Sequence, residues 1–332
     1  MTGRMWTCTM KVIRAIVLAC LGGLLPKAAV GQTIVWTDQI GRRIQRKDVN
    51  GGPIETIVQF PASQVPGQIH YDPLAAKLYY LRFVAGGPDS FQRCNLDGSN
   101  PESIPTPTTG KFSLNVDSRK LYWVEGFGDS ILNYSELDGT GMESHSYSDC
   151  CVLCLEAFGD DLFFGAGLTL QKGIWRSDPD GFNEQFLRQT GQPFDLAYDP
   201  VDSKLYVLNI EGLVRMNLDG TGFENLLFLQ ASDSDHLIVD GLGGKLYWTY
   251  RGEKIQRSNL DGSNVEDFVS ATQIPDADLL GLTIVYTPPP IPALSWGAFW
   301  LLAVFLVASA AIVLRKRVHT SGAPARTAPG SS

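Results

Sequence analysis

The sequence predicts an all-β fold and, within that class, a six-bladed β-propeller. Two short phrases, a strand-forming run and a tight turn, recur six times along the middle of the chain. The turn glycines fall at positions 51, 98, 139, 181, 220 and 262, so the repeats are spaced by 47, 41, 42, 39 and 42 residues. Four short strands in about 42 residues are typical of a propeller blade. A solenoid of helices is not favoured, since no stretch keeps a helical period.

The first phrase of each repeat predicts a strand that is buried on both faces. Examples are Leu246–Thr249, with the sequence Leu-Tyr-Trp-Thr, and Leu121–Val124, with the sequence Leu-Tyr-Trp-Val. A strand with one exposed face would carry a polar residue at every second position, and these runs do not. We therefore expect neighbouring sheets to cover them on both sides.

The second phrase predicts a hairpin turn between the two outer strands. Asn217–Thr221 and Asn259–Ser263 both contain Asn-Leu-Asp-Gly followed by a hydroxyl residue. Glycine after Asp supplies the positive φ that a tight turn needs. Before the turn, Ile255–Leu260 alternates in polarity, as expected of a strand nearer the solvent. After the turn, Asn225–Phe228 and Phe268–Ser270 are the expected outermost strands.

A further strand precedes the first phrase in every repeat except the first. These predicted innermost strands are Ile69–Asp72, Phe112–Asn115, Val152–Leu155, Leu196–Asp199 and Leu237–Asp240. The first repeat begins at Thr33 without one, while the spare segment Leu280–Tyr286 follows the last repeat. We expect this segment to complete the first blade, which closes the ring and leaves no open sheet edge.

Two of these phrases carry a family resemblance. Lys245–Thr249 and Asn259–Asn264 resemble the class B (YWTD) repeats of the low-density-lipoprotein receptor family, which form six-bladed propellers. The resemblance extends over residues 33–287 and is poorest in the fourth repeat, which has Phe163-Phe164 in place of Tyr-Trp. It implies a propeller of the YWTD/TolB-like type over residues 32–287.

Residues 1–31 are typical of a secretory signal peptide. Arg4, Lys11 and Arg14 form a basic region, Ala15–Leu25 is apolar, and small residues precede Gln32. The apolar run is too short to span a membrane. A lipoprotein signal with lipidation at Cys20 is the alternative interpretation.

The other end of the chain predicts a membrane helix. A proline-rich linker at residues 288–295 separates the propeller from nineteen uncharged, mostly apolar residues, 296–314. That length suffices to cross the hydrocarbon core of a bilayer. The basic cluster that opens the tail, residues 315–332, predicts that this end lies in the cytoplasm and the propeller outside it, in the periplasm or at the cell surface.

A sorting motif overlaps the start of this predicted helix. The segment resembles the Ile-Pro-Thr-Leu-type C-terminal sorting signals of Gram-negative bacteria through Ile291, Pro292, Ala293, Leu294, Trp296 and Gly297. The resemblance implies processing by an exosortase-like membrane enzyme. Ala293 replaces Thr, and one residue is missing before Trp296. A plain transmembrane anchor is the alternative.

Charge and cysteine content exclude some classes of partner and site. Residues 32–290 hold 19 basic and 35 acidic residues, a net charge of −16. Such a surface repels nucleic acid and anionic lipid.

Cys94 falls in the second blade and Cys150, Cys151 and Cys154 in the fourth, too far apart for a disulfide between the blades. Buried thiols are the favoured interpretation of the cluster in the fourth blade, with a local disulfide or a metal site as alternatives.

The sequence holds few signs of catalysis. It lacks the motifs of serine hydrolases, zinc proteases and phosphate-binding loops. His70 and His236 lie on or beside innermost strands and are candidates to face the central channel. Nearby Asp72 and Asp240 would orient them, hold a cation or cap turns. We expect no cofactor; bound calcium is an alternative without a supporting motif.

The pattern favours an extracytoplasmic binding module for a protein or glycan ligand. Loops between the second and third strands vary most and are the expected recognition surface. Candidate ligand-binding residues in them are Arg82, Phe83, Glu125, Phe127, Asp129, Tyr250 and Arg251. The alternatives are a hydrolase or lactonase with a metal ion in the channel, and a structural envelope protein.

Overall fold

The computed structural model describes residues 31–106, 110–126, 129–147, 151–167, 172–231 and 236–287. These residues form 24 β-strands, and no helix is found among them. In this part of the chain there is consequently no helix of the length and apolarity that a bilayer crossing needs. The predicted leader, apart from Gly31, and the predicted linker, sorting motif, membrane helix and tail lie outside the described residues.

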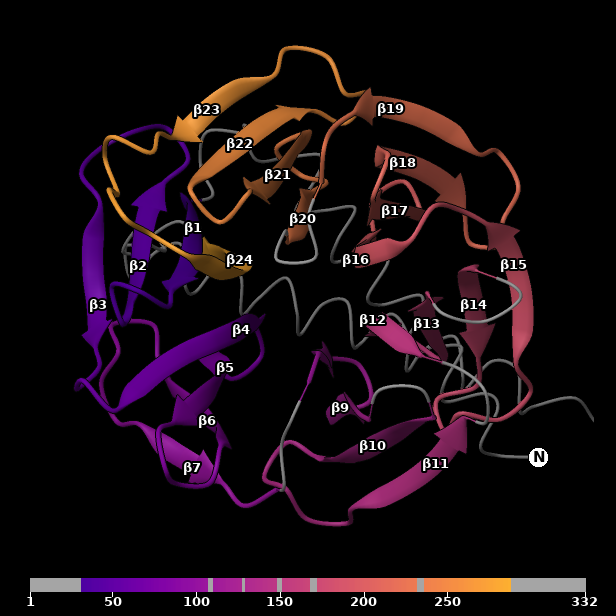
Figure 1. Cartoon of the computed structure of the whole chain (residues 1–332), viewed down its shortest axis with the longest axis horizontal. Coiled ribbons are helices and arrows are strands. Elements are labelled where there is room, and N and C mark those ends of the chain that lie inside the picture. The colour runs from indigo at the N-terminus through magenta and orange to yellow at the C-terminus, as the bar shows by residue number, and fades with distance from the viewer. Residues whose placement is uncertain are drawn as a thin grey trace, which may run out of the picture. The chain divides into compact units, whose positions relative to one another are not determined.

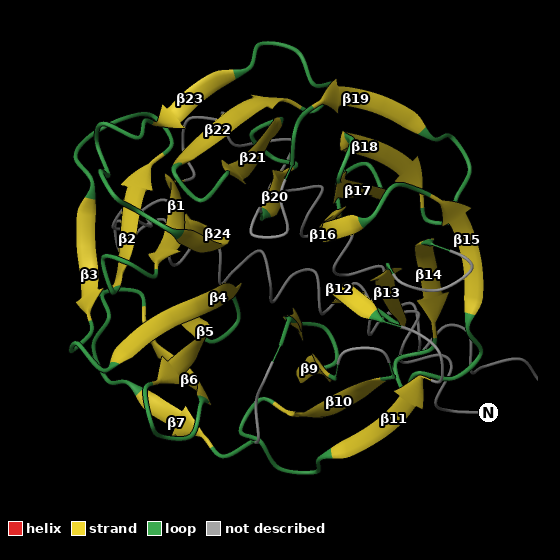
Figure 2. Ribbon diagram, in the orientation of Figure 1, coloured by secondary structure: helices red, strands yellow, loops and turns green. Residues whose placement is uncertain are grey.

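The strands form six four-stranded antiparallel sheets around a common centre, as the sequence predicts (Figures 1 and 2). In the order innermost to outermost, the first three blades are β24 (Leu279–Thr287), β1 (Gly31–Asp38), β2 (Arg43–Asp48) and β3 (Glu55–Gln59); β4 (Gln64–Asp72), β5 (Lys77–Val84), β6 (Ser90–Asn95) and β7 (Glu102–Ile104); and β8 (Phe112–Asn115), β9 (Lys120–Glu125), β10 (Ser130–Glu136) and β11 (Glu143–Tyr147).

The remaining three blades follow the same order. They are β12 (Val152–Phe158), β13 (Asp161–Ala166), β14 (Gly173–Ser177) and β15 (Gln185–Gln189); β16 (Pro193–Asp199), β17 (Lys204–Asn209), β18 (Gly212–Asn217) and β19 (Glu224–Phe228); and β20 (Leu237–Asp240), β21 (Lys245–Tyr250), β22 (Lys254–Asn259) and β23 (Glu266–Val269).

The core lies between neighbouring blades. Residues of the first phrase are buried on both faces of their strands, and Trp36, Trp123 and Trp248 are at most 1% exposed. One apolar cluster joins Ile34 and Trp36 of the first blade to Tyr247 of the sixth. The prediction that these strands are covered on both sides is therefore confirmed, because each sheet packs against a sheet on either side.

The ring is closed by pairing of the last strand with the first. β24 pairs antiparallel with β1 from Gly31 opposite Thr287 to Trp36 opposite Leu282. β24 thus takes the innermost position that the other blades fill with a strand preceding the first phrase. The predicted role of the segment Leu280–Tyr286 is confirmed.

Polar residues at the ends of innermost strands connect successive blades. Asp72 accepts a hydrogen bond from its own turn at the backbone N–H of Leu74 (3.0 Å) and pairs with Arg119 of the third blade (2.8 Å). Asn115 of that blade donates through Nδ2 to the carbonyl of Gly159 in the fourth (3.1 Å). Each such residue fixes its own turn and contacts the next blade.

Asp240 makes the corresponding contacts where the ring closes. Its carboxylate accepts hydrogen bonds from the N–H of Gly243 (2.7 Å), Nε2 of Gln32 (3.0 Å) and the hydroxyl of Tyr286 (3.1 Å). Asp72 and Asp240 therefore cap turns and join blades. Neither aspartate orients its neighbouring histidine, since the described contacts of His70 are with Phe112 and those of His236 are with Asp195 and Lys111.

The fourth blade departs from the prediction in register. Its innermost strand β12 extends to Phe158, three residues beyond the predicted end, and Leu155 rather than Val152 is the equivalent of Leu196 in the fifth blade. Phe158 consequently occupies the position of the strand-end Asp. It contacts the next blade by stacking on Tyr198, with ring centroids 3.5 Å apart. An apolar contact replaces the polar one at this seam.

Gly281 is required where the first and second blades meet. A Cβ atom at this position would lie 2.8 Å from the backbone N of Ile69 and 2.9 Å from Cα of Gln68. We predict that Gly281→Ala lowers the free energy of unfolding by about 1–3 kcal/mol, because β4 must shift to admit the methyl group. Urea denaturation measures this. Gly87→Ala, whose methyl would meet only the side chain of Val84 and no backbone atom, is the matched control; equal stability of the two variants would contradict the prediction.

Candidate functional site

Equivalent positions of the six innermost strands converge on the channel. In every blade one innermost residue pairs with the third residue of the first phrase, as Leu237 pairs with Trp248. In each blade, the residue that immediately precedes this paired residue in the sequence belongs to what we name the upper ring: Gln68, Lys111, Cys154, Asp195, His236 and Gly281. Two positions further along lies the middle ring: His70, Ser113, Glu156, Ala197, Ile238 and Thr283. Alternation along a strand places both rings on the same face of their sheets.

The upper ring lies at the end of the channel where the innermost strands begin. Because the second strand runs back antiparallel, the loop between the second and third strands of each blade returns to this same end. We call this end the upper face. It therefore carries both the predicted recognition loops and the upper ring.

A chain of three polar groups crosses the upper ring: Asp195 and His236 are buried, and Lys111 is half-buried. Nδ1 of His236 lies 3.3 Å from Oδ2 of Asp195, and its Nε2 lies 3.3 Å from Nζ of Lys111. Asp195 also accepts hydrogen bonds from the N–H of Leu237 (2.9 Å) and of Leu196 (3.0 Å). With Nδ1–H donating to Asp195, Nε2 of a neutral His236 accepts from the Lys111 ammonium.

Electrostatics keep this chain in one protonation state. Burial, followed by the charge of Lys111, lowers the pKa of His236 below its usual value. Burial alone would raise the pKa of Asp195, but the hydrogen bond from His236 and the nearby charge of Lys111 outweigh it, and the pKa is lowered. At neutral pH the arrangement is carboxylate, neutral imidazole and ammonium.

The middle ring holds titratable groups that burial keeps neutral. Burial lowers the pKa of His70 to about 4, and its Nε2 lies 2.9 Å from the carbonyl oxygen of Phe112, to which it donates. Burial, reinforced by the charge of Asp195, raises the pKa of Glu156 to about 8. The hydroxyl of Ser113 donates to Glu156 (3.3 Å). His70 and Glu156, together with Asp195 and His236, line a cavity of about 140 Å³, which we call the channel cavity.

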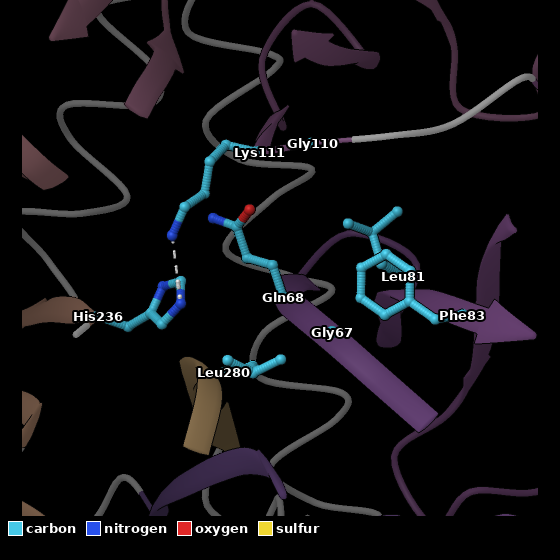
Figure 3. Close-up of a pocket in the computed structure, with 8 residues that line it drawn as sticks. All are labelled: Gly67, Gln68, Leu81, Phe83, Gly110, Lys111, His236 and Leu280. Atoms are coloured by element: carbon cyan, nitrogen blue, oxygen red, sulfur yellow. Dashed lines mark hydrogen bonds between the residues drawn. The ribbon is translucent and has the colours of Figure 1, made fainter. Parts of the chain in front are cut away.

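A larger cavity of about 320 Å³, the upper cavity, opens beside the polar chain (Figure 3). Lys111, His236 and Gln68 are its polar lining, and Leu81, Phe83 and Leu280 are its apolar lining. In Figure 3, Leu81 and Phe83 lie together on one side, and Leu280 lies closer to His236. Gly67 makes room for the Phe83 ring, since a Cβ atom there would lie 2.6 Å from Cε2 of Phe83.

The structure unites some predicted site residues and separates others. His70 and His236 line the channel cavity, and Phe83 of the second blade meets His236 of the sixth in the upper cavity. Tyr250 lies on the upper face of the sixth blade, with the charged groups of Arg251 and Lys254 each 5.4 Å from its ring centroid.

Three other predicted residues make local contacts. Arg82 donates to the hydroxyl of Ser90 (3.0 Å), and Glu125 accepts from Nε1 of Trp123 (3.0 Å). Asp129 precedes β10 and lines neither cavity. Phe127 lies outside the described residues.

The sequence did not predict four residues of the channel: Gln68, Lys111, Glu156 and Asp195. The first, second and fourth immediately precede the predicted innermost phrases of their blades, so comparing that one position across the repeats would have found them. Glu156 was hidden by the three-residue error in the register of the fourth blade.

The described cysteines are buried free thiols. Cys94, Cys151 and Cys154 form no disulfide, and Cys154 belongs to the upper ring. Burial raises the pKa of the Cys94 thiol to about 11. No group of three or more His, Cys, Asp or Glu among the described residues is arranged to hold a metal ion. Cys150 lies outside those residues.

The similarities to solved structures concern the fold. No known protein-family model matches the chain. It is similar to a chain of the nidogen–laminin complex (19% sequence identity, covering 76% of this chain and 98% of that chain, TM-score 0.62). It is also similar to TolB from Acinetobacter baumannii (13% sequence identity, covering 81% of this chain and 69% of that chain, TM-score 0.62). A third similar structure is a protein of unknown function from Bacteroides caccae (10% sequence identity, covering 77% of this chain and 99% of that chain, TM-score 0.54). At these identities the similarities show a six-bladed propeller.

Glu156 makes the stability of the propeller depend on pH. Its pKa of about 8 exceeds that of an unfolded glutamate, so ionisation favours the unfolded chain increasingly as pH rises toward 8. His70, with a folded pKa of about 4, contributes a slope of the opposite sign that fades above pH 6.5, and this contribution is the same in both proteins and cancels in their difference. We predict that between pH 6.5 and 8 the wild type loses about 2 kcal/mol of unfolding free energy relative to Glu156→Gln.

Urea denaturation at a series of pH values measures the difference between the two proteins. The matched control is Glu253→Gln, which changes an exposed glutamate in the turn before β22. Parallel stability curves for the wild type and Glu156→Gln across this window would contradict the prediction.

Proposed function

We propose that the chain is an extracytoplasmic binding propeller, anchored in the membrane or sorted to the cell surface, that recognises a protein or glycan ligand with its upper face. The observation that carries this proposal is the convergence of Phe83, His236 and Lys111 on one cavity at that face. Polar and apolar lining in one cavity is typical of a recognition site.

The surroundings of the upper cavity support the same role. Tyr250, with Arg251 and Lys254 beside its ring, places an aromatic group among cations two blades away from Phe83. Tyr and Arg are enriched at recognition hot spots because they combine a large contact area with hydrogen-bonding groups. The rigid ring of sheets holds these side chains in fixed relative positions.

The similarity to a chain of the nidogen–laminin complex supports a protein ligand, since that propeller fold occurs there in an assembly between two proteins. The predicted signal peptide, membrane helix and basic tail support the location. Together they would hold the propeller outside the cytoplasm.

We predict that a photoreactive amino acid at position 250 forms cross-linked products in intact cells, and that one at position 74 does not. Leu74 is 63% exposed but lies in the turn after β4, at the end of the ring opposite the upper face. Gel mobility detects the products. Digestion with a protease or a glycosidase then separates protein from glycan ligands. Equal cross-linking from both positions would contradict recognition by the upper face.

Mass spectrometry of the mature termini tests the location. We predict an N-terminus at Gln32 and loss of residues beyond the sorting motif, because an exosortase-like enzyme removes the tail. An intact C-terminus would contradict processing and favour the plain anchor. A lipidated Cys20 at the N-terminus would contradict the proposed signal peptide.

A further inference from the structure

The upper cavity has the chemistry of a site for a small organic acid. The Lys111 ammonium faces this cavity, and none of the ion pairs found among the described residues includes it. Its described partner is a neutral imidazole nitrogen, Nε2 of His236 at 3.3 Å. The ammonium donates one hydrogen bond to this nitrogen, which leaves two of its three protons for other acceptors.

Gln68 supplies a second donor to the same place. Its Oε1 accepts from the backbone N–H of Phe112 (2.8 Å), which fixes the amide with its nitrogen turned toward Lys111 (Figure 3). Two donors, Nζ of Lys111 and Nε2 of Gln68, thus approach the cavity from neighbouring blades. This pair suits the two oxygens of a carboxylate, and the ammonium makes the interaction charge-assisted.

The rest of the cavity lining selects for an apolar substituent. Leu81, Phe83 and Leu280 offer aliphatic and aromatic surface, and no charged group lies among them. The volume of about 320 Å³ equals that of roughly ten water molecules, and so suits an acid of about ten non-hydrogen atoms.

Charge restricts the ligand to a single negative group. Asp195 lies behind His236, whose imidazole separates its carboxylate from the Lys111 ammonium, so among the described residues the ammonium has no acidic side chain in direct contact. Residues 32–290 carry a net charge of −16. One carboxylate meets one half-buried ammonium, while a phosphate or dicarboxylate would bring an unpaired charge into an acidic protein.

We propose that the upper cavity binds a free monocarboxylic acid with an apolar body, such as an arylalkanoic or medium-chain aliphatic acid. The carboxylate contacts Lys111 and Gln68, and the apolar body packs on Phe83, Leu81 and Leu280. This site goes beyond the proposed recognition of a macromolecule, and its test contains no macromolecular ligand. The failure of either proposal therefore leaves the other standing.

Isothermal titration calorimetry of the purified full-length protein tests the proposal with 3-phenylpropionate, phenylacetate and hexanoate at millimolar concentration. The neutral 3-phenylpropanamide has the same shape as the first acid and lacks its charge. We expect at least one acid to bind, and we expect the amide to bind at least about tenfold more weakly than 3-phenylpropionate, because a hydrogen bond to a charged group is lost. This comparison uses the wild-type protein and needs no variant to fold.

Variants locate the site. Lys111→Met is expected to weaken acid binding at least about tenfold and Phe83→Ala several-fold. Lys77→Met is the matched control, because Lys77 lies in the second blade beside Glu102 of an outer strand (3.8 Å) and should leave binding unchanged. Failure of all three acids to bind, equal affinity for the amide, or unchanged binding by Lys111→Met would each overturn the proposal.

Discussion

The pairing of β24 with β1 is the constraint on which the rest of the structure depends. It joins the two ends of the propeller and makes the sixth and first blades neighbours like any other pair. Only in a closed ring do the innermost strands of non-adjacent blades face one another across the centre. Lys111 of the third blade meets His236 of the sixth for this reason, although 125 residues separate them.

Much of the architecture could be predicted because the repeat restates the same physical pattern. Asp-Gly turns and doubly apolar strands located the blades, and the spare strand located the closure. The fourth blade differs from its prediction because its innermost strand lacks the terminal Asp, so the sequence predicts only the short apolar run Val152–Leu155 as a strand. Phe158 and Glu156 were misplaced as a result.

The site was predictable only in part, since channel contacts join residues that are distant in sequence. His70 and His236 were recognised from their places on innermost strands, and Phe83 from its loop. The partners of these residues were not predicted. Asp195 contacts His236 from the neighbouring blade, and a single sequence does not indicate which residues of different blades come into contact. The two rings also differ in electrostatics. The upper ring keeps charges on either side of an imidazole, while the middle ring holds His70 and Glu156 neutral by burial.

Under the proposed extracytoplasmic location, the unpaired thiols would meet an oxidising compartment. A secreted protein with unpaired cysteines is at risk of scrambled cross-links during maturation. In the finished propeller, however, Cys94, Cys151 and Cys154 are shielded from solvent and from oxidants. Their vulnerability is confined to the interval before the ring shuts. Fast closure of the ring therefore protects the thiols from oxidation. The rate at which a thiol reagent alkylates these sulfurs in the mature protein would report how often the ring opens.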